Sequence, residues 1–283
     1  MNAFITPVLV VIFVWWLSTG AVPWSAQRSD MSGRLASLLI IAMIGCGVAG
    51  AFLASALEQP TAPYAAFISA VLVWGGLGFS LLMGRIVGPT TAAAGVEASN
   101  TERFLRAFRS ICDHKIAPLA ALLVLAASWL ARAHILALVT FAVLWLMRIS
   151  AKLCLFFGVP YIVLDMVPKH LRHITDHFGR VHRSTAFVSM LALLTLGAFC
   201  TAAAMWTGAI PKTTASLIVA TLFALAVLEH WFMALPVSDS KLWRWAISTS
   251  TPSSPKLAKQ HLAADAAKWQ AHRDLQQETG HEF

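Results

Sequence analysis

Glu229 and His230 are two adjacent polar residues inside the last long apolar stretch of the chain. Ionisable side chains that face hydrocarbon are costly, so this pair indicates either chemistry or a polar contact with a neighbouring helix. A histidine nitrogen can ligate the magnesium of a chlorin pigment, and Ala226, one turn earlier, leaves room for the macrocycle. The favoured alternative is that His230 hydrogen-bonds a neighbouring helix while Glu229 pairs with a cation.

Arg148 and Lys152 are natural cationic partners for Glu229. They stand one turn apart at the end of an earlier apolar stretch and therefore share one face of its helix. If the two stretches touch, the sequence predicts an intramembrane polar network of Glu229, Arg148 and Lys152. A structural lock is favoured over a proton relay, because no chain of carboxylates crosses the membrane.

A second group of polar residues forms a histidine face at His170, His173 and His177. Spacings of three and four place these side chains on one side of a helix, but the first and last are roughly 10 Å apart along its axis. One metal ion cannot bind all three, although a pair could hold zinc or iron with outside help. We expect no metal site and favour a basic surface that meets lipid head groups or a partner. The arginines assigned to the same surface are Arg103, Arg106 and Arg172.

Enzyme motifs are absent from suitable contexts in this sequence. It contains no P-loop, nucleophile elbow, zinc-protease motif or dinucleotide-binding glycine pattern. The last apolar stretch has no central lysine, which argues against a retinal Schiff base, and the chain shows no matched halves with broken helices. We therefore expect no catalytic residue and no enzymatic activity.

The elements that position these residues are long and apolar. Of the 283 residues, 58% are hydrophobic and only 12% are charged, which excludes an ordinary water-soluble domain. A bilayer core of about 30 Å needs roughly 20 apolar residues per helix. The composition predicts an all-α, polytopic membrane protein, a bundle of about seven helices. The seven stretches are residues 5–22, 35–57, 65–87, 116–131, 134–157, 184–208 and 213–236, of which the fourth is the shortest.

The basic residues predict the orientation of this bundle. With seven crossings and an outside N-terminus, all but two of the 21 lysines and arginines face the cytoplasm, together with the C-terminus. The two exceptions are Arg132 and Lys212. The net charge of +8 is therefore a topology signal, and we expect lipids but no nucleic acid as partners.

The domain organisation follows from these segments. Residues 1–247 form the transmembrane domain, with cytoplasmic surface helices expected near residues 102–115 and 168–180. Residues 248–283 begin with STSTPSSP and are expected to be a flexible linker and a polar cytoplasmic tail.

Three strings resemble one known family. They are FVWWLSTGAVPW at Phe13–Trp24, VLWLMRISAKLCLFFGVP at Val143–Pro160 and TLFALAVLEHWFMALPVSDSKLWRWAI at Thr221–Ile247. In order and spacing they are similar to the PuhE family, the photosynthetic complex assembly proteins of purple bacteria. The chain departs from the family pattern at Trp74–Gly78, where a polar Trp-Gly-Trp-His-Glu is usual, so it resembles a divergent member.

The resemblance implies a non-enzymatic assembly factor or accessory subunit of the reaction centre or light-harvesting complex. It implies a multi-pass protein of the cytoplasmic or intracytoplasmic photosynthetic membrane, with reaction-centre or light-harvesting subunits as partners. Glycines such as Gly45, Gly47 and Gly75 would let its helices pack closely. Two alternatives stay open. One is a carrier of bacteriochlorophyll or another tetrapyrrole with His230 as axial ligand, and the other is a metal-dependent membrane enzyme of pigment or lipid metabolism.

Overall fold

A computed structural model describes residues 2–26, 33–83, 112–161, 183–235, 242–243 and 245. The chain divides into a unit of residues 1–247 and a unit of residues 248–283, and every described residue belongs to the first. The expected surface helices near residues 102–115 and 168–180, and the tail, lie outside the described residues. The same is true of His170, His173, His177, Arg172, Arg103 and Arg106.

The described residues form seven helices, all within the stretches predicted from the sequence apart from a few residues at their ends. They are α1 (Asn2–Ala26), α2 (Gly33–Ala54), α3 (Thr61–Leu82), α5 (Cys112–Leu130), α6 (Ile135–Phe157), α7 (Thr185–Trp206) and α8 (Thr214–Ala234). The all-α prediction is therefore confirmed.

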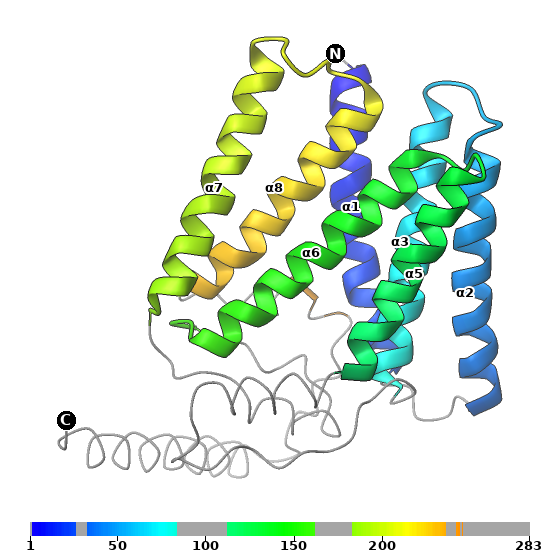
Figure 1. Cartoon of the computed structure of the whole chain (residues 1–283), viewed down its shortest axis with the longest axis horizontal. Coiled ribbons are helices and arrows are strands. Elements are labelled where there is room, and N and C mark those ends of the chain that lie inside the picture. Colours follow the sequence, from blue (N-terminus) through cyan, green and yellow to red (C-terminus); the bar gives the residue numbers. More distant parts are fainter. Residues whose placement is uncertain are drawn as a thin grey trace. The chain divides into compact units, whose positions relative to one another are not determined.

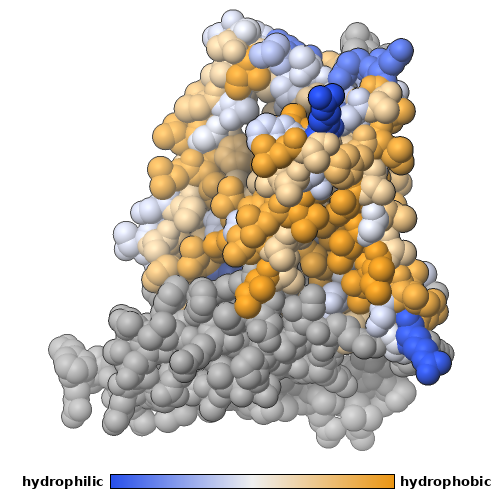
Figure 2. Space-filling view, turned by 45° about the vertical axis from the view of Figure 1, so that its right-hand side comes forward, coloured by the Kyte–Doolittle hydropathy of each residue, from blue (hydrophilic) through white to orange (hydrophobic). Residues whose placement is uncertain are grey.

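Six of these helices are long and apolar enough to cross a membrane. The exception is α5, whose apolar part, Ile116–Leu130, is shorter. The full length of α5, Cys112–Leu130, nevertheless corresponds to about 28 Å, close to the thickness of a hydrocarbon core. Figure 2 shows apolar residues over much of the visible side of the bundle. The protein is a polytopic helical membrane protein.

Successive helices alternate in direction along the bundle (Figure 1). Consequently α1, α3, α6 and α8 end at the same end of the bundle at which α2, α5 and α7 begin. The chain segments 27–32, 84–111 and 162–182 connect helix ends at this end of the bundle. At the opposite end the connections are short: residues 55–60, 131–134 and 207–213.

The short connections are ordered by local hydrogen bonds. Arg132 adopts a left-handed conformation with φ of 76°, and the next amide, that of Ala133, donates to the Ser128 carbonyl 2.8 Å away. This pattern ends α5 as a Schellman motif does. The His134 amide then donates to the Ala51 carbonyl (2.9 Å), which joins the end of α2 to the start of α6.

Helices α2 and α3 pack together through glycines. A Cβ atom at Gly47 would lie 2.7 Å from the Ser69 carbonyl oxygen, and one at Gly76 would lie 2.9 Å from Ile44 Cγ1. Such close approach of backbones is the usual role of small residues between membrane helices. By contrast, nothing lies within 4 Å of a Cβ atom built at Gly45. Gly47 and Gly76 therefore serve packing between helices of this protein. The sequence alone does not show whether a glycine packs against a helix of the same chain or faces outward.

The main core lies where α3, α6 and α8 meet the other helices. Fully buried Phe67 on α3, Phe141 on α6 and Ile218 on α8 belong to one cluster. Trp74 of α3 packs edge-on against Phe141, with ring centroids 5.6 Å apart. This core fixes the relative rotation of α6 and α8, which decides where their polar residues point.

Candidate functional site: a polar hub on α8

Three consecutive residues of α8, Glu229, His230 and Trp231, each hydrogen-bond a different helix. Neighbouring residues of an α-helix point about 100° apart, so three in a row cover about 200° of its circumference. Glu229 faces α1, His230 faces α6 and Trp231 faces α7. We call these three residues and their partners Trp15, Ser150 and Thr195 the α8 hub.

His230 is fully buried and uses both ring nitrogens. Nδ1 lies 2.8 Å from the Ala226 carbonyl oxygen, which can only accept, so Nδ1 carries the proton. Nε2 lies 2.9 Å from Ser150 Oγ on α6. In the neutral ring Nε2 is therefore an acceptor, and the Ser150 hydroxyl donates to it. The helices that carry Arg148 and His230 therefore touch, through Ser150, which is the condition on which the predicted polar network depended.

This geometry bears on pigment binding by His230. A magnesium ion would need the Nε2 lone pair, which already accepts the Ser150 hydroxyl proton, and the ring has no exposed surface. The residues present therefore do not fit an axial ligand site without rearrangement of α6 against α8. Ligation of bacteriochlorophyll by His230 remains a prediction that this arrangement does not favour.

Glu229 accepts a hydrogen bond from the Trp15 indole, whose Nε1 lies 2.9 Å from Glu229 Oε1. Trp15 is half-buried on α1, more than two hundred residues away in the sequence. The contact therefore joins the first and last helices of the bundle. This charge-assisted hydrogen bond from the indole satisfies part of the hydrogen-bonding capacity of the Glu229 carboxylate within the protein.

The predicted pairing of Arg148 with Glu229 is not observed. Because Ser150 is the residue of α6 that faces α8, Arg148 and Lys152, each two residues away, point about 200° round the helix from it. Arg148 is exposed, and no hydrogen bond or ion pair joins it to any residue that the structure describes. Arg148 and Lys152 lie one turn apart on α6, as the prediction of a polar network assumed. Pairing of Lys152 with Glu229 stays a prediction.

Trp231 completes the hub on its third side. Its indole Nε1 donates to Thr195 Oγ1 on α7, 3.1 Å away, while Thr195 Oγ1 itself donates to the Leu191 carbonyl of its own helix (2.7 Å). Because α7 has few buried side chains, namely Phe187 and Met205, this bond is one of the specific contacts that hold it in place.

The segment that follows α8 docks on α1 through tryptophans. Trp16 Nε1 donates to the Leu242 carbonyl (3.0 Å), and Trp243 Nε1 donates to the Trp16 carbonyl (2.9 Å). Trp243 also stacks edge-on against Trp15 with centroids 5.4 Å apart, and it is 2% exposed. A Cβ atom at Gly20 would lie only 2.8 Å from Trp243, so a glycine is needed there for this approach. Leu242 and Trp243 thus extend the hub on the α1 side.

None of the hub's partner residues was predicted from the sequence to hydrogen-bond Glu229, His230 or Trp231. Trp15, Ser150 and Thr195 are ordinary residues of apolar helices, and no periodicity identifies them. The signal that could have found two of them is the similarity of whole strings, because Trp15 and Ser150 lie in the segments that resemble the PuhE family.

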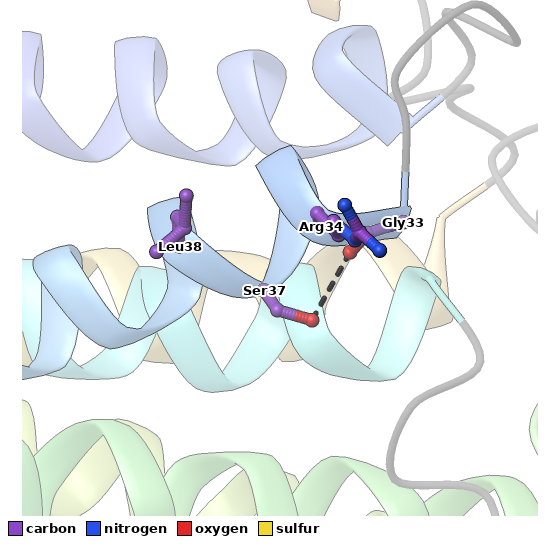
Figure 3. Close-up of a pocket in the computed structure, with 4 residues that line it drawn as sticks. All are labelled: Gly33, Arg34, Ser37 and Leu38. Carbon is purple, nitrogen blue, oxygen red and sulfur yellow. Dashed lines mark hydrogen bonds between the residues drawn. The ribbon is translucent and has the colours of Figure 1, made fainter.

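A shallow surface hollow of about 620 Å³ lies at the start of α2. Figure 3 shows its lining, Gly33, Arg34, Ser37 and Leu38, with the Ser37 hydroxyl directed to the Gly33 carbonyl 3.1 Å away. It is separate from the α8 hub in sequence and lies on a different helix. In the part of the chain that the structure describes, no three histidine, cysteine or acidic side chains gather as a metal site would require.

Fold and hub together define a multi-pass helical membrane protein in which helices α1, α6 and α7 converge on a polar tripeptide of α8. The chain belongs to the DUF3623 family, described as "Protein of unknown function", whose model matches residues 1–254. It is 39% identical over 249 residues to the "Uncharacterized 30.4 kDa protein in puhA 5'region" of Rhodobacter capsulatus. That alignment covers 84% of this chain and 89% of the relative. No solved structure matches the chain.

Proposed function

We propose that this protein is a non-enzymatic helper of photosynthetic complexes, acting as an assembly factor or a resident accessory subunit in the inner or intracytoplasmic membrane of a purple bacterium. The observation that carries this proposal is the similarity, over most of both chains, to a protein named for its place beside the photosynthesis gene puhA. The resemblance of three separate strings to the PuhE family points the same way and supports the proposal that the chain is a divergent PuhE protein.

The structure supports a role in binding rather than catalysis. The polar side chains of the α8 hub are used to hold helices together: His230 satisfies both nitrogens, and Glu229 and Trp231 each bond another helix. A site that turns over a substrate would need polar groups directed into an accessible cavity. The one hollow described above is shallow and lies at the start of α2.

The distribution of basic residues supplies the surface for partners. The connecting segments at one end of the bundle, with the residues after α8 and the adjoining helix ends, carry all lysines and arginines except Arg132 and Lys212. By the positive-inside rule this end faces the cytoplasm, so that basic loops meet anionic lipid and acidic surfaces of the complexes. His170, His173 and His177 would belong to this surface.

A clean deletion of the gene in a photosynthetic host tests the proposal. We expect reaction-centre and light-harvesting absorption per cell to fall several-fold while free bacteriochlorophyll is still made, and a plasmid copy to restore it. Unchanged amounts of every photosynthetic complex in the deletion strain, under light-limited growth, would refute the proposal.

The same strains separate the two other functions. A pigment carrier would purify with a bound chlorin spectrum that His230→Ala removes, and a metal enzyme would purify with iron or zinc. We expect neither in protein purified from pigmented membranes under mild conditions.

A further inference from the structure

The segment that follows α8 is held on α1 mainly by one buried side chain. We call its residues Leu242, Trp243 and Trp245 the strap. Trp243 is 2% exposed, whereas Leu242 and Trp245 are 45% and 44% exposed. Two hydrogen bonds join the strap to α1: the Trp16 indole donates to the Leu242 carbonyl (3.0 Å), and the Trp243 indole donates to the Trp16 carbonyl (2.9 Å). A segment with one buried side chain and few bonds belongs to the parts of a protein that open first.

Gly20 is the residue of α1 that lets the strap close. It lies four residues after Trp16, and a helical side chain covers the turn that precedes its own Cα atom. Because Gly20 has no side chain, the Trp16 carbonyl can accept the Trp243 indole proton in addition to its helical bond. A Cβ atom at Gly20 would lie 2.8 Å from Trp243 and closer still to Trp245. A single added methyl group would therefore exclude the strap.

The strap also contacts the residue of α1 that bonds α8. Trp243 packs edge-on against Trp15 with ring centroids 5.4 Å apart, and the Trp15 indole donates to Glu229. Trp15 itself is only half-buried. Among the described side chains of α1 beyond Val11, only Gly20 is buried, and its nearest neighbours are the rings of the strap. The strap is therefore a main packing partner of the second half of α1.

We infer that the strap is a lock on α1. While the strap is closed, Trp243 holds the Trp15 indole against Glu229, and when the strap opens, this hydrogen bond between α1 and α8 is lost with it. Trp243 is thus a positioning residue that acts through Trp15. The chain continues from Trp245 into the unit of residues 248–283, which gives that unit a covalent route to the α8 hub. The lock does not depend on the proposed function.

Exchange of the indole N–H protons with water tests this inference. It is measured by NMR on the full-length protein in nanodiscs, with tryptophan labelled at the indole nitrogen. Gly20→Ala should accelerate exchange at Trp243, Trp16 and Trp15 together, by about tenfold. Alanine has a higher helix propensity than glycine, so a weaker helix cannot explain this result. Gly45→Ala is the matched control and should leave all rates nearly unchanged, because a Cβ atom there meets nothing within 4 Å.

The Trp231 indole is an internal control on the other side of α8. It bonds Thr195 of α7 and should keep its wild-type exchange rate, whereas equal acceleration there would mean that the whole bundle has loosened and would contradict the lock. Trp243→Ala, which removes the buried ring of the strap without changing α1, should raise the Trp15 rate at least as much as Gly20→Ala does. If Trp15 exchanges at its wild-type rate in either variant, it keeps Glu229 without the strap, and the inference is overturned.

Discussion

At the scale of single residues, the account depends on the α8 hub, in which one tripeptide bonds three helices. His230 is the central member, because it is fully buried and its tautomer is fixed by the Ala226 carbonyl on one nitrogen and Ser150 on the other. Losing either partner would leave a polar atom of a buried group unsatisfied, which costs more than the net strength of one hydrogen bond.

We predict that Ser150→Ala destabilises the protein by about 1 kcal/mol, in the range measured for hydrogen bonds between membrane helices. The His230→Ala and double variants complete a cycle whose coupling energy should be about 0.5–1.5 kcal/mol. Unfolding in detergent followed by circular dichroism gives these values. Thr201→Ala, which removes a hydroxyl bonded only to the Gly197 carbonyl of its own helix, should change stability by less than about 0.5 kcal/mol. A coupling energy near zero would contradict the geometry of the Ser150–His230 contact.

At the scale of elements, α2 and α3 are the most intimately packed pair, and the fit depends on which glycines face inward. Gly47→Leu should destabilise the protein by about 2 kcal/mol or more, since its side chain would meet Val73 and the Ser69 carbonyl. Gly45→Leu on the same helix has open space and should be nearly neutral. The thermal midpoints of the two variants in nanodiscs are compared with that of the wild type. Equal decreases in the midpoint would show that α2 turns a different face toward α3 than the structure does.

The start of α6 provides a pH-dependent element outside the membrane span. His134 caps α6 by accepting a hydrogen bond at Nδ1 from the Leu136 amide (3.2 Å), which requires the neutral ring, and burial lowers the pKa of His134 below its ordinary value of 6.5. Because the unfolded chain then binds the proton more readily than the folded one, the stability from this cap is complete above about pH 6.5. It is lost as the pH falls below that value.

His134→Asn keeps a capping side chain without titrating near neutrality. We therefore predict that the thermal midpoint of the wild type falls more steeply than that of His134→Asn between about pH 7 and about pH 5. Parallel pH profiles would show that the cap does not titrate in this range.

The sequence predicted the elements well and their rotations poorly. Long apolar stretches fix where helices form, because a bilayer leaves the backbone few alternatives, and all seven were found. The face that each helix turns inward depends on packing against neighbours that are distant in sequence. For this reason Arg148 was expected to pair with Glu229, but the structure shows Trp15 of α1 as a partner of Glu229, which the sequence did not predict. The histidine face lies outside the described residues and stays a prediction.

At the scale of the whole molecule, the central claim is that the described helices bring nearly all basic residues to one side of the membrane. Because the seven described helices alternate in direction, the helix ends that the longer segments join lie at one end of the bundle (Figure 1). The proposed function requires an odd number of crossings, which would separate Arg132 and Lys212 from the other basic residues and create the basic cytoplasmic surface that we propose for its partners.

Reporter fusions at the C-terminus, combined with cysteine labelling near the N-terminus, test this claim most directly. Alkaline phosphatase joined after residue 283 should be inactive and green fluorescent protein at the same place should fluoresce. A single cysteine at Asn2, in a variant without the four native cysteines, should react with an impermeant maleimide added to intact cells. If both termini instead report the same compartment, the chain crosses an even number of times, and the proposed basic partner surface is contradicted.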